Sequence, residues 1–458
     1  MNKTFSYTHC DFGVATRDVT PPVGIYARSW GAATHDVAEG VHRPFAATAA
    51  VFAPVEGDEP TLALVAVDLG WFQHIPDERA LRTTILERTG LDDEALLINM
   101  SHTHAGANIN SELAGKPGGE LIEPYLERLT EQLVEALLEA REKLEPSWVT
   151  YGTGRCALAV NRDLWDADAE RFACGYNPDA HADDTLVVAK VTGESGALRA
   201  TLFNYACHPT TLAWRNRLLS PDYIGAAREV LENAFGAPAL FLQGASGELG
   251  PRDNYVGEAH VADSNGRQLG YAAAAAIESL PPPGTRFVYM GIVASGANLA
   301  AWEYQPCDDE QLRESEQLAA IVTNVGLRRK EELGVVASLS APDSIQEQEK
   351  ALRRRYLSAA LGDDPVFEMP IWTWRLGGAL LVAIPNEPYS VLQVELRRRL
   401  AGTPLLVLGV TNRTMGYLSP EETYGTGLYQ EQQSPFAPGC LEQTIEAAAE
   451  ALEELRMR

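Results

Sequence analysis

This chain of 458 residues lacks several signatures that would assign it to a common class of protein. Its six cysteines are scattered and none forms a Cys-X-X-Cys pair, so neither a zinc ribbon nor a thioredoxin-type motif is present. No glycine-rich P-loop or dinucleotide fingerprint occurs, which argues against a nucleotide cofactor. No apolar run approaches the roughly 18 residues that indicate a membrane span. No internal repeat, low-complexity tract or linker divides the chain.

Positive charge is also scarce, because 37 Lys and Arg residues stand against 63 Asp and Glu residues, for a formal net charge of -26. Such an acidic surface repels phosphate backbones and anionic lipid, so nucleic acid is not an expected partner. Few scattered cysteines suit a reducing compartment, and the N-terminus lacks the apolar core of a signal peptide. We therefore expect a soluble cytoplasmic protein that acts on a small molecule. Its oligomeric state stays open, with a homo-oligomer as one alternative.

The alternation of apolar strand-like runs with helical patterns predicts an α/β fold, with a mixed sheet core flanked by helices. We expect one domain over residues 1–458. Leucines recur at helical spacing in residues 119–143 and predict an amphipathic helix there. The charged residues 309–361 are expected to be a mostly helical insertion at the rim of the pocket, with two antiparallel helices as one arrangement. Residues 285–298 are expected to form a strand and residues 411–440 an ordered loop.

Candidate site residues follow apolar strands, at the point where each strand ends. His102 and His104 come after the apolar run 96–98, and in an extended backbone positions i and i+2 point to the same side. In α/β sheets, ligands collect beyond the carboxyl ends of strands. Zinc takes imidazole nitrogen and carboxylate oxygen, so two or three histidines with Glu387 would suffice. Taken singly, each of these residues could equally be a hydrogen-bonded loop residue. Other polar groups in the same context are Asp68, Asn161, Arg162, His208, the glycine-rich loop 243–250 and the tyrosines of residues 411–429.

Seven short motifs, in order and at similar spacing from about residue 11 to residue 445, resemble the N-terminal catalytic domain of the neutral/alkaline non-lysosomal ceramidase family. The family's Thr-His-Thr-His-Ser-Gly resembles residues 101–106, its Val-His-Pro-Thr resembles residues 207–210, and its Pro-Gly-Glu resembles residues 385–387. Its Ile-Thr-Pro-Pro-like turn, Asn-Arg, Tyr-X-Thr-Thr-X-Glu-Glu-Tyr and Tyr-Glu-X-X-Ser motifs resemble residues 18–24, 161–162, 417–424 and 429–434.

The resemblance implies the family's catalytic-domain fold and a mononuclear Zn²⁺ site. It assigns the metal to four ligands, which are His102, His208, Glu387 and Tyr417. It assigns substrate-contacting and transition-state roles to three further residues, which are His104, Arg162 and Tyr429. A zinc ion lowers the pKa of a bound water toward about 7, so the expected activity is hydrolysis of an amide or ester by metal-activated water.

The sequence departs from the family pattern at one catalytic position. The family's Gly-Asp-Val-Ser-Pro-Asn loop corresponds to residues 247–252, where Gly250 stands in place of the serine. Glycine cannot be a nucleophile, and Ser246 lies four residues earlier, so we do not expect Ser246 to replace it. The chain also ends where full ceramidases continue into a β-sandwich domain. We therefore expect a substrate other than ceramide. The alternatives are a ceramidase-like binding protein that has lost its chemistry, or a metal-dependent enzyme of another class, such as a lyase or a glycan-directed enzyme.

Overall fold

The structure is a computed structural model that describes residues 2–57, 59–72, 74–330 and 345–457. Its centre is an eight-stranded mixed sheet with the strand order β14-β12-β11-β7-β2-β4-β5-β6. Only the pairs at the two edges, β5 with β6 and β12 with β14, run parallel. The strands are β2 (Tyr7–Asp18), β4 (Ala46–Ala53), β5 (Leu62–Val67), β6 (Leu96–Met100), β7 (Glu145–Arg155), β11 (Thr185–Gly193), β12 (Leu198–Tyr205) and β14 (Ala239–Gln243).

A second, four-stranded sheet packs on one face of the first. Its order is β18 (Leu318–Arg328), β19 (Val366–Leu376), β20 (Ala379–Ala383) and β22 (Leu405–Leu408). In each strand every second side chain faces the interface between the two sheets, because successive side chains of a strand point to opposite faces. Phe12 and Phe52 of the large sheet thus share one buried cluster with Trp374 of the small sheet.

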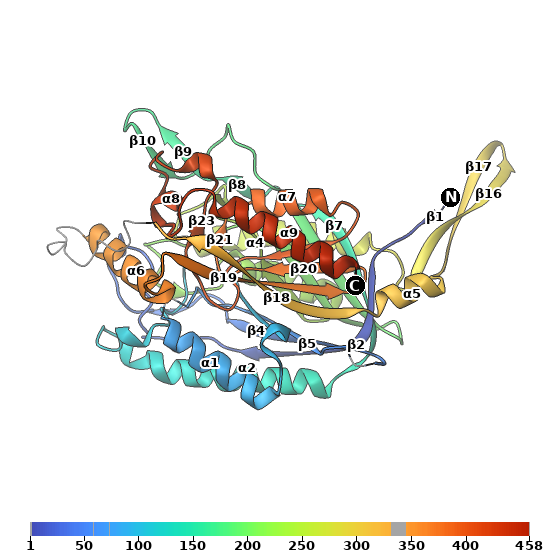
Figure 1. The fold of residues 1–458 in the computed structure, drawn as a ribbon, viewed down its shortest axis with the longest axis horizontal. Helices are drawn as coiled ribbons and strands as arrows, with labels where there is room; N and C mark the ends of the chain where they lie inside the picture. The colour runs from blue at the N-terminus through green and yellow to red at the C-terminus, as the bar shows by residue number, and fades with distance from the viewer. Residues whose placement is uncertain (1, 58, 73, 331–344, 458) are drawn as a thin grey trace.

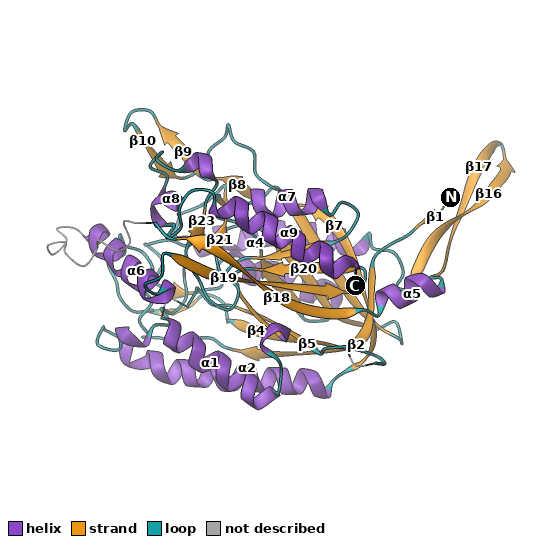
Figure 2. Ribbon diagram, in the orientation of Figure 1, coloured by secondary structure: helices purple, strands orange, loops and turns teal. Residues whose placement is uncertain are grey.

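Helices cover the outer faces of both sheets (Figures 1 and 2). On the large sheet lie α1 (Ile75–Thr89) and α2 (Ile122–Glu142) beside α3 (Tyr223–Phe235) and α4 (Ala259–Glu278). The small sheet is covered by α7 (Val391–Arg399) and α9 (Cys440–Met457). The predicted α/β fold with a helix-flanked mixed sheet is therefore confirmed, with the addition that two sheets lie face to face between the helical layers. No helix in the described part of the chain is both long and apolar enough to span a bilayer.

The prediction for residues 309–361 is wrong in the middle of the segment. Helix α5 (Asp309–Ser315) opens it and α6 (Ile345–Leu361) closes it, but β18 lies between them and pairs with β19 along its whole length. The consecutive β-branched residues 321–323 favour this strand, whereas the charged flanks dominated the sequence pattern. Residues 331–344 lie outside the described residues.

Two shorter expectations also need correction. The strand expected over residues 285–298 is a hairpin, in which β16 (Thr285–Ser295) turns at Gly296 into β17 (Ala297–Pro306). Gly296 has φ 68, a left-handed value that glycine adopts without a steric penalty. This hairpin stands out from the body of the molecule (Figure 1). The loop expected over residues 411–440 contains β23 (Tyr417–Leu418), a 3-10 turn η5 (Glu421–Thr423) and the short helix α8 (Tyr429–Gln433).

One buried amide ties the two edges of the large sheet to the small sheet. Asn99 lies on edge strand β6, and its Oδ1 accepts a hydrogen bond from the backbone N–H of Gln243, at the end of the other edge strand β14, at 2.8 Å. Its Nδ2 donates to the carbonyl of Gly409, just after β22, at 2.8 Å and to Oγ1 of Thr411 at 3.0 Å. The carboxyl ends of three strands are therefore held together at one place.

We expect Asn99→Ala to lower the free energy of unfolding by about 2–4 kcal/mol, because the buried N–H of Gln243 loses its acceptor and the buried carbonyl of Gly409 and hydroxyl of Thr411 each lose one partner. Chemical denaturation measures the change. Asn298→Ala, in the exposed part of β17, serves as the matched control and should have little effect. A loss below about 0.5 kcal/mol for Asn99→Ala, as for a surface substitution, would contradict this role.

Candidate metal centre

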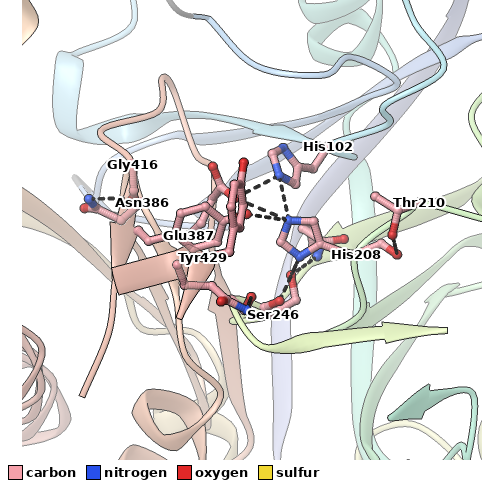
Figure 3. A network of polar contacts seen from close by, with 12 residues as sticks. His102, His208, Thr210, Ser246, Asn386, Glu387, Gly416 and Tyr429 are labelled. Carbon is pink, nitrogen blue, oxygen red and sulfur yellow. Dashed lines mark hydrogen bonds and ion pairs between the residues drawn. The ribbon is translucent and has the colours of Figure 1, made fainter. Parts of the chain in front are cut away.

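Four side chains from segments far apart in the sequence converge beyond these strand ends. His102 follows β6, and His208 lies three residues after β12. Glu387 and Tyr417 lie opposite each other where the two-residue strands β21 (Glu387–Pro388) and β23 pair in parallel. Figure 3 shows His102, His208 and Glu387 pointing toward a common point. His102 has φ 66, a conformation that is uncommon outside glycine and is found where a site imposes it.

The ligand atoms of these side chains lie close together in a fully buried space. Nε2 of His102 is 3.1 Å from Nε2 of His208, and each of these nitrogens is 3.3 Å from Oε2 of Glu387. The hydroxyl of Tyr417 lies 3.4 Å from Nε2 of His208. All four side chains are at most 2% exposed, so water does not screen their mutual interactions.

The other ring nitrogen of each histidine is committed to a backbone carbonyl. Nδ1 of His102 lies 3.2 Å from the oxygen of Gly70, and Nδ1 of His208 lies 2.8 Å from the oxygen of Ser246. A carbonyl can only accept, so both Nδ1 atoms carry a proton. In the neutral rings, both Nε2 atoms then present lone pairs to each other and to a carboxylate. This repulsive arrangement becomes attractive when a cation lies between the lone pairs.

The donor set and its spacing fit a tetrahedral zinc ion. Ligands at about 2.0–2.1 Å from a tetrahedral centre are about 3.3–3.4 Å from one another. The four separations observed here run from 3.1 to 3.4 Å. Two imidazoles, a carboxylate and a phenol oxygen are nitrogen and oxygen ligands of the kind zinc accepts.

The protonation states also suit a cation. Burial, with Arg162 as the next cause, lowers the pKa of His208 to about 3, so this ring is neutral at physiological pH. Burial alone would raise the pKa of Glu387, but positive charge and hydrogen-bond donation at its oxygens, first from His102 and then from His208 and Arg353, would hold it well below its usual range, which is the effect that a cation between these ligands also has. Burial and then the charge of Glu387 raise the pKa of Tyr417 well above its ordinary value. A divalent cation would counteract this last effect, since it favours the ionised form of a coordinating group.

His104 lies beside the four converging side chains. Its ring centroid is 5.0 Å from that of His102 and 5.8 Å from that of His208. Ligand atoms of these three histidines all lie within 4.8 Å of one another, so a cluster of three imidazoles is the alternative ligand set. Both ring nitrogens of His104 are buried without a hydrogen-bond partner in the described part of the chain. Burial and then His102 lower its pKa well below the ordinary value, so the ring is neutral.

The ring of His104 lines a pocket of mixed polarity. Its centroid is 5.2 Å from that of Trp30 and 4.6 Å from that of Trp71. Nε1 of Trp30 is also buried without a partner among the described residues. The remaining wall combines small apolar side chains, such as Ala105 and Ala213, with the polar side chains of His35, Asn216 and Arg217. Unpartnered polar atoms of His104 and Trp30 therefore lie at a pocket beside the four converging side chains.

The structure places the other two predicted site residues at the same centre. The guanidinium of Arg162 is 4% exposed and donates to the carbonyl of Gly247 at 2.6 Å and to the hydroxyl of Tyr417 at 3.2 Å. Tyr429, the first residue of α8, is 38% exposed and lies edge-on to Tyr417, with ring centroids 5.9 Å apart. Its exposure suits a group that meets a substrate entering from solvent.

Three further positions have roles that the sequence did not define. Gly250 lies on a short strand beside Arg162, and a Cβ atom built on it would stand 2.8 Å from Nδ2 of Asn254, so a serine there would displace Asn254. Ser246 holds His208, because its carbonyl binds Nδ1 and its Oγ lies 3.3 Å from the same atom. Asp68 is not at the centre, since it forms an ion pair with Arg228 at 2.7 Å.

Sequence reasoning missed Arg353, which reaches the centre from α6. Its Nη1 donates to the hydroxyl of Tyr429 at 2.7 Å, and its Nη2 lies 3.9 Å from Oε1 of Glu387. The residue stands in a run of three arginines, 353–355, which reads as a solvated helix face. The only signal in the sequence was the expectation that residues 309–361 border the pocket.

Comparison with known proteins gives a family match. The family model described as neutral/alkaline non-lysosomal ceramidase, N-terminal, matches residues 11–246. The neutral ceramidase of Mycobacterium tuberculosis is 23% identical over 485 residues, which cover 91% of this chain and 73% of that protein. The neutral ceramidase of Pseudomonas aeruginosa is 23% identical over 467 residues, which cover 93% of this chain and 69% of that protein.

Solved structures show the same fold. The crystal structure of neutral ceramidase from Pseudomonas aeruginosa matches with a TM-score of 0.68 at 19% identity, over 98% of this chain and 75% of that chain. A ceramidase complexed with C2 matches with a TM-score of 0.66 at 19% identity, over 98% of this chain and 76% of that chain. At this level of identity the likeness establishes the arrangement of the two sheets and their helices.

Zn²⁺ is expected to raise the melting temperature of the wild-type protein, because an ion that binds only the folded state stabilises it by about 2.7 kcal/mol at a hundredfold excess over Kd. His102→Ala should remove most of this shift, since it removes one of the two facing lone pairs. His260→Ala, which changes an exposed histidine on α4, is the matched control and should keep it. Equal shifts in all three proteins would mean that zinc binds elsewhere.

Proposed function

Because this chain belongs to the neutral/alkaline non-lysosomal ceramidase family, we propose that it is a zinc-dependent hydrolase of an amide (N-acyl) or ester bond. One observation carries the proposal. The two Nε2 atoms of His102 and His208 and a carboxylate oxygen of Glu387 lie within 3.1 to 3.3 Å of one another, with both Nδ1 atoms hydrogen-bonded to carbonyls. Such a set has no favourable state without a cation or a shared proton.

His102, His208, Glu387 and Tyr417 would hold the ion. When bound, zinc supplies Lewis acidity and a water nucleophile whose pKa is lowered toward about 7. Gly70 and Ser246 contribute through their carbonyls, which fix the ring orientation and tautomer of the two histidines.

The remaining residues of the centre would act on the substrate. The neutral ring of His104 has both nitrogens available, so one can donate a hydrogen bond to the carbonyl oxygen or move a proton to the leaving group. The Tyr429 hydroxyl, which already accepts from Arg353, can donate to the same oxygen. Arg162 would hold a polar or anionic part of the substrate. The loop 244–250 is not expected to add oxyanion donors, because the N–H groups of Gly244, Ala245, Gly247 and Leu249 already donate to acceptors within the protein.

The position of Gly250 favours attack by water without an acyl-serine intermediate. No hydroxyl stands there, and the space that a serine Cβ would need is bounded by Asn254. Ser246 is an unsuitable substitute, because its hydroxyl accepts from Gln243 at 2.7 Å behind His208. This departure supports a substrate other than ceramide. It also motivates the second candidate function, a ceramidase-like binding protein that holds metal and ligand without turnover.

We expect zinc-loaded wild-type protein to hydrolyse 4-nitrophenyl acetate or an N-acetyl 4-nitroanilide, used here as simple ester and amide probes. His104→Ala should keep the metal and lose about 10²- to 10⁴-fold in kcat/KM, which is the usual contribution of a proton-transfer group. His102→Ala should lose both metal and activity. Metal content measured on the same samples separates the two effects.

His260→Ala, far out on the surface of α4, should match the wild type in metal content and rate. Full activity in His102→Ala or in metal-free protein would contradict the role of zinc. Stoichiometric metal with no turnover of either probe would favour the binding-protein alternative over the hydrolase.

A further inference from the structure

Positive charge at the metal centre exceeds the negative charge that faces it. Arg162 is 4% exposed, and no carboxylate lies within ion-pair distance of it among the described residues. Its guanidinium contacts the carbonyl of Gly247 and the hydroxyls of Tyr417 and Tyr255. Arg353 has a side chain 20% exposed, and its ion-pair partner is Glu387, at the long distance of 3.9 Å. Of these two largely buried guanidinium groups, only that of Arg353 thus has a carboxylate near it, and at a long distance.

The other acidic groups near Arg162 are engaged elsewhere. The oxygens of Asp163 accept hydrogen bonds from the Tyr389 hydroxyl at 2.9 Å and from Gln430 at 2.7 Å. The carboxyl of Glu248 accepts from the backbone and the hydroxyl of Ser390. Neither group forms an ion pair with an arginine of the centre in the described part of the chain.

A bound divalent ion would increase this imbalance. With the ion, two arginines and a divalent charge face the single charge of Glu387, and at most one more if Tyr417 is ionised. A buried excess of positive charge is costly unless an anion balances it. This is unexpected in a chain whose formal net charge is -26, because most of its surface repels anions.

Arg353 has donors to spare toward such an anion. A guanidinium carries five N–H donors in a planar fork that matches a carboxylate, and the hydrogen bond to Tyr429 uses one of them. Oε1 of Glu387, on the side that faces Arg353, has no hydrogen-bond partner among the described residues. The Trp71 ring lies 6.0 Å from the guanidinium carbon and also borders His104, so Arg353 faces the same space as the substrate-facing histidine.

We propose that Arg353, together with Arg162, binds a carboxylate of the substrate, so that the natural substrate is an amide or ester that carries a carboxylate near the bond to be cleaved, as an N-acyl amino acid does. This inference rests on the proposed function, because it places the scissile bond at the zinc ion. The proposed substrate differs from ceramide in its charge, because ceramide has no carboxylate. The pocket beside His104, which has both apolar and polar lining residues, would take the rest of such a molecule.

Three hydroxamates test the proposal on zinc-loaded protein by calorimetric titration. They are acetohydroxamate, the monohydroxamate of succinate, and the same compound with its carboxylate converted to a primary amide. The wild type should bind the succinate compound at least about tenfold more tightly than the amide compound, because a carboxylate on a guanidinium makes charge-assisted hydrogen bonds. Arg353→Gln should abolish most of that preference, and its affinity for acetohydroxamate, which has no carboxylate, should change much less than its affinity for the succinate compound.

Two further variants test whether the effect belongs to the guanidinium group of Arg353. Arg353→Lys retains a charge without the planar fork and should keep part of the preference. Arg355→Gln, two residues along the same helix, changes an exposed arginine that pairs with Glu112 and should keep all of it. Equal affinity of wild type for the charged and uncharged compounds overturns the proposal. An undiminished preference in Arg353→Gln overturns the role of Arg353, as does a parallel loss of acetohydroxamate binding, which would show that Arg353 only supports Glu387.

The outcome also distinguishes this proposal from the function on which it rests. If acetohydroxamate fails to bind zinc-loaded wild type, the proposed metal centre is contradicted, and so is the substrate proposal that depends on it. If acetohydroxamate binds and the carboxylate has no effect, the hydrolase remains and the anionic substrate class is excluded.

Discussion

The two imidazole nitrogens that face each other at 3.1 Å, with a carboxylate oxygen 3.3 Å from both, are the constraint on which the rest of the site depends. Their Nδ1 atoms are hydrogen-bonded to carbonyls, so neither ring can turn its lone pair away without leaving a buried acceptor unpaired. A cation resolves this conflict, and the donor set and its spacing match those of zinc. The positive φ of His102 is one place where the fold accepts strain to maintain this arrangement.

The architecture explains how residues more than 300 positions apart meet at this point. His102 and His208 follow strands near the two edges of the large sheet, and Glu387 and Tyr417 follow strands of the small sheet. Asn99 hydrogen-bonds to the ends of both sheets and thereby fixes the distance between these segments. The stability of the fold and the geometry of the metal centre therefore share one buried side chain.

The sequence predicted the type of fold and nominated the residues that converge, since His102, His104 and His208 stand just after apolar strands. It could not show convergence, because the contacts that join β6, β14 and β22 link residues with no fixed spacing. The prediction missed strand β18 because the charged residues on either side of it resemble a helical segment, although its own β-branched residues favour a strand. Arg353 was missed for a related reason, since an arginine among arginines on a helix resembles a solvated face. Gly250, which stands where the family has a serine, indicated a difference in the chemistry of the site. The structure adds that Asn254 borders the space that a serine side chain would need.

The central claim is that a zinc ion binds between His102, His208, Glu387 and Tyr417, and X-ray absorption at the zinc edge of the stoichiometrically loaded protein tests it most directly. The account predicts a first shell of nitrogen and oxygen ligands only, at about 2.0–2.1 Å, with the multiple scattering typical of two imidazoles. The buried Cys207, which adjoins His208, makes the alternative distinguishable. A sulfur ligand at about 2.3 Å, a shell without imidazole, or an unchanged spectrum in His102→Ala would contradict the account.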